Sequence, residues 1–304
     1  EFHQQDLTMR RRLVEIGNRE KRVDSDYFRS VFGFQGELSG WDWETAYSYI
    51  KSDSVERGVD GFPNSRRTQE AIDSGLFNPF EPSSNSQETL DFIETQTTRY
   101  GKSTSKSFDG KISGPIMDMS AGELMLAVGA EYREETISDN PDDQFLRGDV
   151  FGTEATQANG ARDNTSIFAE LAIPVTTTLN VQVAVRHEDY SDFGSNVSWK
   201  LSSRYKLADD KLVIRGSVSS GFRAPALHQM FYTAVTTTLT ENGIQQNGIL
   251  NNSDPALRAL GIPKLKPETS TSIGAGLSYR ITRKIGITAD VYQIDVDDRI
   301  ALSG

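Results

Sequence analysis

The chain has 304 residues, a formal net charge of −11, three histidines and no cysteine. The negative charge argues against a nucleic-acid partner, because phosphate binding needs a surplus of Lys and Arg. The absence of cysteine excludes disulfides, thiolate metal sites and cysteine nucleophiles. No run of about 18 apolar residues occurs, so a membrane-spanning helix is excluded. A membrane barrel is not excluded, because its strands alternate and keep a low mean hydropathy.

The first residues of the chain form a basic segment. Met9–Arg22 contains Arg10, Arg11, Arg12, Arg19, Lys21 and Arg22. An anionic partner would explain this charge, but a solvated rim near an anionic membrane surface explains it as well and is the interpretation we prefer. The chain opens without the apolar region of a signal peptide, which fits a mature protein and an internal fragment equally.

A hairpin is predicted next, because apolar residues alternate on both sides of Ser39-Gly40. The residues of one face are Phe28, Phe32, Phe34 and Leu38, followed by Trp41, Trp43, Tyr47 and Tyr49. A two-residue turn pairs Leu38 with Trp41 and keeps both sets on one face.

The segment from Lys51 to about Lys102 is predicted to be a long loop that contains two short helices. The first is expected at 65–72, with Ser65 as its N-cap and Gly75–Phe80 after its end, and the second at 86–97. A loop of this length in a compact fold indicates function or disorder.

Period-two alternation returns in the rest of the chain and predicts about ten strands in total. The stretches are Leu124–Tyr132, preceded by a weakly patterned 103–113; Thr165–Ile173 with Leu179–Val185; Val197–Leu207 with Leu212–Val218; and Ile273–Ile281 with Ile285–Val291. If Leu207 faces Leu212, Leu201 faces Val218, so each apolar set lies on one face. In the last strand the apolar parity drifts toward Tyr292, which predicts a bulge or a strand that rises beyond a lipid belt.

This pattern favours a transmembrane β-barrel over a soluble β-sandwich. Sandwich strands usually have about 5–6 residues, whereas several of these approach the roughly 9–11 that a tilted strand needs to cross a bilayer. The connections alternate between tight turns and long loops, which is the layout of outer-membrane barrels. Trp41, Trp43, Trp199 and Tyr205 suit an aromatic girdle, although a packed core would also accept them.

A second long loop is predicted from Phe222 to Lys266, with a Thr-rich stretch at 236–238, an Asn-rich stretch at 247–252 and a helical turn at 255–260. Polar and aromatic side chains in such loops suit a bound ligand, and a solvated lid accounts for them equally. The sequence therefore assigns no ligand-binding residue.

Three motifs in chain order resemble the signature of TonB-dependent outer-membrane receptors. They are Ser219-Ser220-Gly221-Phe222-Arg223-Ala224-Pro225, then Leu265-Lys266-Pro267-Glu268-Thr269-Ser270, then the strand 290–300 that ends Asp-Asp-Arg-Ile. Gly75–Phe80 and 11–17 are weaker matches. Gly221 lets a strand leave the wall and Pro225 cannot continue a ladder. We expect Arg223 to form a salt bridge at the rim rather than to touch substrate.

The resemblance implies that residues 1–304 are part of an all-β, antiparallel transmembrane barrel. The family's barrel has 22 strands, of which about ten are present here, with long extracellular loops that contain short helices. We expect the plug domain and the TonB box to be absent. The terminal aromatic of a last barrel strand is also missing at Gly304.

The function implied is that of a bacterial outer-membrane receptor that takes up a scarce nutrient with energy supplied through TonB. An iron–siderophore, a cobalamin or a glycan would bind at the extracellular loops, TonB would bind the full-length protein, and outer-membrane lipid would surround the wall. A barrel that binds a surface ligand without transport and a soluble β-rich binding module remain as alternatives.

An enzyme is not expected, and neither a catalytic residue, a cofactor nor a metal site is predicted. His187-Glu188 has no second His at helical spacing, and no Gly-x-Ser-x-Gly or phosphate loop occurs. The acids Asp295, Asp297 and Asp298 lack the Gly and distal Glu of a calcium loop, so they are interpreted as rim acids.

Overall fold

The computed structural model describes residues 11–150, 155–240 and 243–301. Twelve strands dominate this part of the chain. They are β1 (Glu20–Leu38), β2 (Trp41–Asp60), β3 (Thr97–Met119), β4 (Gly122–Pro141), β5 (Ala155–Pro174), β6 (Leu179–Tyr190), β7 (Gly194–Leu207), β8 (Leu212–Arg223), β9 (Tyr232–Thr240), β10 (Gly243–Ile249), β11 (Glu268–Arg280) and β12 (Gly286–Asp297).

Helices occur only between strands or before the first one in the described residues. They are the α-helices α1 (Ser65–Asp73), α2 (Gln87–Ile93), α3 (Asp143–Leu146), α4 (Leu227–Phe231) and α5 (Pro255–Ala259), with 3-10 turns at Val14–Ile16 and Pro82–Ser84. No helix in the described ranges has the length and apolar character needed to span a membrane.

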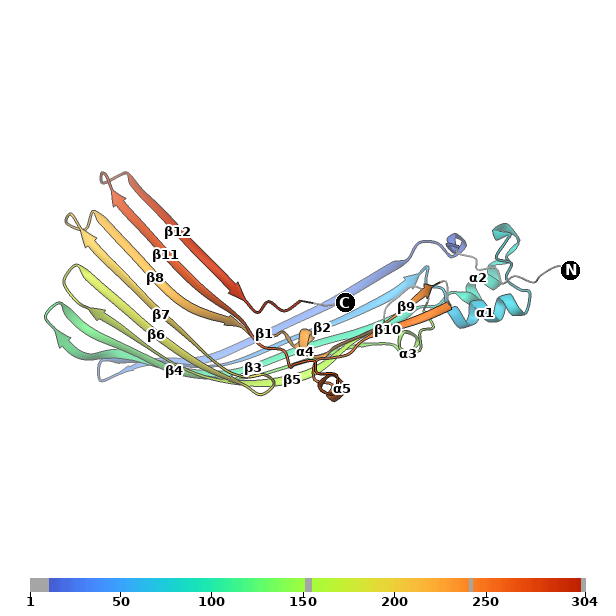
Figure 1. Cartoon of the computed structure of the whole chain (residues 1–304), viewed down its shortest axis with the longest axis horizontal. Helices are drawn as coiled ribbons and strands as arrows, with labels where there is room; N and C mark the ends of the chain where they lie inside the picture. The colour runs from blue at the N-terminus through green and yellow to red at the C-terminus, as the bar shows by residue number, and fades with distance from the viewer. Residues whose placement is uncertain (1–10, 151–154, 241–242, 302–304) are drawn as a thin grey trace.

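The strands form one curved, open antiparallel sheet in the order β1-β2-β3-β4-β5-β6-β7-β8-β11-β12. Tight turns gather at one end, here called the turn end, and helices α1, α2 and α3 lie at the other, the loop end (Figure 1). Strands β1 to β5 have 19 to 23 residues and form the tall half. Strands β6, β7, β8, β11 and β12 have 12 to 14 residues and form the short half. The tall half therefore extends farther toward the loop end.

The registers predicted for the hairpins β1–β2, β7–β8 and β11–β12 are confirmed. Leu38 faces Trp41, Leu201 faces Val218, and Ala275 faces Val291. The outward side chains form an apolar belt with aromatic residues, because directly opposed residues share a face. Members of this outer face include Phe28, Trp43, Phe108, Tyr132, Ile167, Val185, Trp199, Ile214 and Leu277.

Several predicted boundaries were wrong. β2 continues to Asp60 and β3 begins at Thr97, so the first loop covers only 61–96 instead of 51–102. The strand predicted at Leu124–Tyr132 reaches Pro141. Part of the loop predicted at 222–266 is the hairpin β9–β10, which raises the strand count from about ten to twelve. The apolar pattern stops earlier than the backbone pairing, because outer-face residues near the loop end are charged: Lys106 faces Glu134.

Two explanations were offered for the parity drift in the last strand, and the first of them, a bulge, is wrong. β12 pairs with β11 without a shift in register. Along its outer face Val291 is followed by Asp295 and Asp297, so the strand continues beyond the apolar belt. The second explanation of the parity drift is therefore confirmed. A register shift does occur in β3, between Pro115 and Met117, where Pro115 has no N–H for the ladder.

Two glycines of the tall half lie directly opposite an aromatic side chain. Gly36 faces Trp43 and Gly129 faces Phe168. A Cβ atom on Gly36 would lie 2.8 Å from the Trp43 ring, and one on Gly129 would lie 2.5 Å from the Phe168 ring. Each ring therefore occupies the space that the missing side chain leaves.

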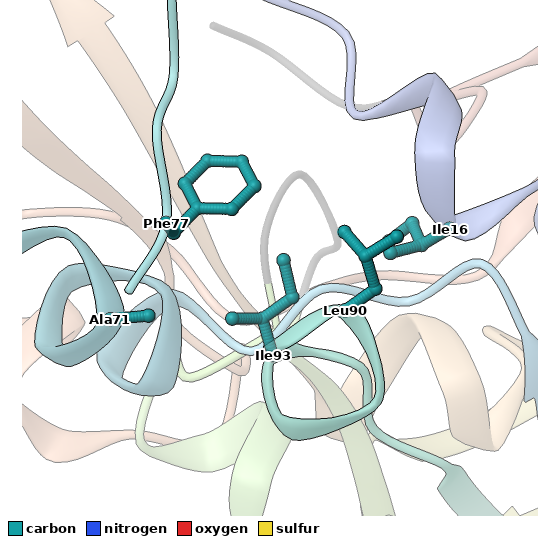
Figure 2. Close-up of a cluster of buried hydrophobic side chains, with 5 residues drawn as sticks. All are labelled: Ile16, Ala71, Phe77, Leu90 and Ile93. Atoms are coloured by element: carbon teal, nitrogen blue, oxygen red, sulfur yellow. The ribbon is translucent and has the colours of Figure 1, made fainter. Parts of the chain in front are cut away.

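The connection between β2 and β3 folds into a small helical unit at the loop end, here called the cap (residues 61–96). Its core contains Ile16, Ala71, Phe77, Leu90 and Ile93, which converge from the 3-10 turn before β1, from α1 and the segment after it, and from α2 (Figure 2). The N-cap of α1 is Asn64 rather than the predicted Ser65, since its side chain accepts the Arg67 N–H. The second helix is shorter than predicted, and Ser86 caps it.

The connection between β8 and β11 crosses to the tall half. Helix α4 lies against the inner face of β5, where the Phe231 ring covers Gly160. Strand β9 then pairs with β5, with Tyr232 opposite Ala158 and Val235 opposite Ala155. The short β6–β7 hairpin leaves this part of the β5 edge free, and β9 occupies it. Helix α5 forms where a helical turn was predicted.

Candidate functional site at the loop end of the inner face

The inner face carries a network of ion pairs near the middle of the sheet. Arg186 on β6 donates to Glu131 on β4 at 3.1 Å, to Ser166 on β5 at 2.7 Å and to Glu188 at 2.5 Å. Its guanidinium also lies over the Phe168 ring, with Cζ 6.0 Å from the ring centroid. Because directly opposed residues share a face, three neighbouring strands place these side chains in one cluster. The arrangement gives the inner face fixed charges.

A second ion pair lies nearer the cap. The Arg99 guanidinium of β3 donates two hydrogen bonds to the Asp139 carboxylate of β4, at 2.6 and 2.5 Å. Such a forked pair is geometrically specific. Helix α4 brings His228 Nε2 to 3.8 Å from Asp139 Oδ2. The α4 connection therefore approaches the wall at this pair.

A polar cavity of about 300 Å³ is built around the Arg99–Asp139 pair. Its lining includes Ser52, Ser54, Glu56, Ser103, Ser138 and His228. Hydroxyl groups, one forked ion pair and one imidazole can hydrogen-bond a polar ligand from several sides. Within the described ranges, no cluster of three side chains that could hold a metal ion is found. The cavity suits binding.

A larger hollow of about 990 Å³ lies on the inner face toward the turn end, mostly along the short half. Arg215 on β8 crosses it and pairs with Asp290 on β12, with Nε 3.0 Å from Oδ1. Gly276 lies opposite Arg215, and a Cβ there would collide with this pair. The long side chains therefore lie flat along the wall.

The three sequence motifs meet at one carboxylate, that of Glu268 at the start of β11. Arg223 of the first motif donates to it at 2.8 and 2.6 Å. The backbone N–H of Ile300, from the third motif, donates to Glu268 Oε1 at 2.9 Å. The expectation that Arg223 forms a rim salt bridge is confirmed. Two segments distant in the sequence are thus tied to the end of β8.

The other residues discussed from the sequence do not converge on one site. Asp295 and Asp297 lie on the outer face of β12, on the opposite side from the polar cavity. In the basic segment, Arg11 pairs with Glu15 and donates to the Pro79 carbonyl of the cap, whereas Lys21 pairs with Glu56. Met9 and Arg10 lie outside the described residues. Arg11 and Lys21 thus bind residues at the loop end, as expected for a segment at the rim of the wall.

Sequence reasoning missed Arg99, Asp139, Arg186 and Glu131. Each stands at an inward position of its strand, so extending the alternation toward the loop end would have placed them on the inner face. Their pairing also depends on the register between β3 and β4, which the shift at Pro115 changes.

Comparison with known proteins supports this architecture. The sequence profile described as "TonB dependent receptor-like, beta-barrel" matches residues 6–304. The probable TonB-dependent siderophore receptor PirA of Acinetobacter baumannii is 29% identical over 169 residues, which cover 51% of this chain and 21% of that receptor. The vitamin B12 transporter BtuB of Photobacterium profundum is 25% identical over 89 residues, covering 29% of this chain and 14% of that protein.

The crystal structure of the siderophore receptor PirA from Acinetobacter baumannii superposes with a TM-score of 0.59 at 20% identity. The match covers 90% of this chain and 35% of that one, so the chain spans about a third of the solved receptor. The open sheet is thus a partial barrel wall. The chain belongs to the TonB-dependent receptor β-barrel family.

Proposed function

We propose that this chain is a wall segment of an outer-membrane receptor that imports a scarce nutrient with energy supplied through TonB. The observation that carries the proposal is the contrast between the two faces of the wall. The outer face is an apolar, aromatic belt suited to lipid, and the inner face carries ion pairs and a polar cavity beneath the cap. The cavity would receive the nutrient at the extracellular side, and TonB would act on the remainder of the receptor.

An iron–siderophore, a cobalamin and a glycan are the substrate classes proposed. Each presents many hydrogen-bonding groups, which the hydroxyls of Ser52, Ser54 and Ser103 and the charges of Arg99 and Asp139 can engage. The relatives named for a siderophore and for vitamin B12 support two of the three.

Uptake by cells that express the full-length receptor tests this function. A radiolabelled ferric siderophore, radiolabelled cobalamin and a radiolabelled oligosaccharide are each supplied, with and without a functional TonB system. Uptake of one substrate that stops without TonB is expected, and uptake that persists would overturn the proposal. Binding with no uptake would instead identify a barrel that only holds a ligand through its loops.

A pair of variants then tests the cavity. Arg99→Gln should weaken binding of the transported substrate, because it removes the forked donor from the cavity wall. Arg57→Gln is the matched control, since Arg57 pairs with Asp24 on the outer face of the tall half. Equal losses in both variants would show that the cavity is not the binding site.

A further inference from the structure

The connection that follows β8 is held along one stretch of β5. Between Ala155 and Arg162, β5 makes three contacts with this connection. It pairs with β9, the Phe231 ring covers Gly160, and the Arg162 side chain donates a hydrogen bond to the Pro225 carbonyl. The hydrogen bond to Pro225 is the first of these contacts along the connection. Its acceptor, Pro225, is the last residue of the Gly-Phe-Arg-Ala-Pro motif, where the chain leaves the wall.

Arg162 itself is almost buried, with a tenth of its side chain exposed. Nε donates to Glu135 Oε2 of β4 at 2.8 Å, and Nη1 donates to the Pro225 carbonyl oxygen at 2.6 Å. The guanidinium also lies over the Tyr190 ring, with Cζ 5.3 Å from the centroid. Glu135 and Tyr190 fix the position of the guanidinium, while Nη1 alone contacts the connection.

A second acceptor for Nη1 lies beside the first. Asp192, in the turn between β6 and β7, has 8% of its side chain exposed, and its Oδ2 is 3.8 Å from Nη1. The backbone N–H groups of Asp192 and Phe193 lie beside this carboxylate, but neither carboxylate oxygen has an aligned hydrogen-bond donor. A buried carboxylate without a donor is unfavourable. Burial accordingly raises the pKa of Asp192 above its ordinary value.

We propose that Arg162 is a two-position latch. In the position seen here Nη1 holds the Pro225 carbonyl, and in the second it turns to the Asp192 carboxylate while Nε keeps its bond to Glu135. Satisfying Asp192 partly offsets the loss of the neutral carbonyl acceptor, so the second position is a minor but populated state. The second position releases the start of the connection, and α4 and β9 can then leave β5.

The latch would control access to the inner face at the loop end. Helix α4 carries His228 to the Arg99–Asp139 pair, so its departure opens the proposed binding cavity. The role in access rests on the proposed function. The latch itself does not, because it concerns contacts within this chain, and its test therefore needs no substrate and no transport.

Amide hydrogen exchange of residues 226–235 in the full-length receptor, purified in detergent, tests the latch. Arg162→Ala should speed exchange there by roughly tenfold, because the anchor is lost. Asp192→Asn should instead slow it by at least about threefold, because the charged alternative acceptor is removed. A merely structural Asp192 would give faster or unchanged exchange, and either result overturns the proposal.

A double variant and a control complete the test. In Arg162→Ala, adding Asp192→Asn should change exchange no further, because the two residues act through one contact. A further effect of Asp192→Asn in that background contradicts the latch. Arg133→Ala is the matched control, since this inner-face arginine pairs with Glu131 away from the connection. If residues 226–235 exchange as fast in Arg133→Ala as in Arg162→Ala, the loss of any inner-face arginine loosens the connection.

Discussion

The tall half and the short half of the wall share one sheet but differ in what their strands do. A tilted strand crosses a bilayer with about 9–11 residues. The strands of the short half have 12 to 14 residues and little more than this, whereas those of the tall half have 19 to 23. The difference shows that about ten residues per tall strand serve purposes other than spanning. They raise the inner face toward the loop end and carry the cap and the polar cavity.

The largest effect is expected at a second buried cluster of the tall half, which Phe62 forms with Phe145 and Val150. Phe62→Ala should destabilise the cap region by about 3–5 kcal/mol, because Phe62 is fully buried against Phe145 and Val150. The apolar belt should stay intact. Limited proteolysis of the full-length receptor reports on the cap, and the heat-dependent electrophoretic mobility of the barrel reports on the wall.

Phe80→Ala is the control for the cap, since Phe80 is 80% exposed in the same unit. Cap cleavage that rises equally in both variants would show that the buried cluster does not stabilise the cap. Loss of the heat-dependent mobility shift in Phe62→Ala would show that the cap and the belt unfold together.

The short half should respond most strongly to charge on its outer face. Trp199→Arg should cost about 2–4 kcal/mol near the bilayer midplane and less near an interface, because Trp199 belongs to the apolar belt. Lys200→Arg, on the inner face, should be nearly silent. Urea unfolding of the full-length receptor in lipid vesicles measures both changes. Equal effects would refute the assignment of the two faces.

The rim of the short half depends on one carboxylate. Glu268→Gln should loosen the ends of β8 and β12, because a neutral amide weakens the forked bond from Arg223 and the bond from the Ile300 N–H. Faster amide exchange at Ile300 is the expected result, with a smaller effect on the receptor than Phe62→Ala. Glu123→Gln, near the turn end, should leave that exchange unchanged. If amide exchange at Ile300 is unchanged in Glu268→Gln, the three motifs meet at this carboxylate but do not stabilise one another through it.

The smallest effect concerns pH and the cap. Burial and then the neighbouring Asp60 raise the pKa of Glu94 above its ordinary value, despite the Gly61 N–H that donates to it at 2.6 Å. An acid with a raised folded-state pKa binds its proton more readily when folded, so its stabilising contribution is complete at low pH and is lost as pH rises through that pKa. The cap should therefore become slightly more stable as pH falls through the raised pKa of Glu94.

Glu94→Gln should reduce this pH dependence, because the amide does not ionise. Amide exchange of residues 87–93, corrected for the intrinsic rate at each pH, measures it. Glu81→Gln, at an exposed position of the cap, should retain the dependence. If Glu94→Gln retains it in full, another group is responsible.

The sequence predicted the belt of both halves correctly but missed the upper part of the tall half. Apolar and polar residues alternate where one face of a strand contacts lipid or a core. Inside the belt this pattern correctly predicted Leu201 opposite Val218. Above the belt both faces are polar, as Lys106 opposite Glu134 shows, so the alternation stops while the backbone ladder continues. The Thr-rich strand β9 escaped prediction for the same reason.

The candidate site was less predictable than the fold. The position of Arg99 beside Asp139 depends on every residue of β3 and β4 below it, including the shift at Pro115. The position of His228 depends on a connection that crosses from β8 to β5. Local patterns do not specify such distant pairings, whereas the forked bond between Arg223 and Glu268 lay within motifs that could be recognised directly.

The glycines that face aromatic rings have a consequence for how such a wall assembles. A slip of one residue between β1 and β2 would turn every side chain to the wrong face and would place Trp43 beside Gln35 or Glu37 instead of Gly36. A slip between β4 and β5 would likewise remove the Phe168 ring from the gap at Gly129. Neighbouring strands of the tall half thus recognise one another by shape as well as by polarity. Register errors between these strands would therefore be opposed sterically while the sheet assembles.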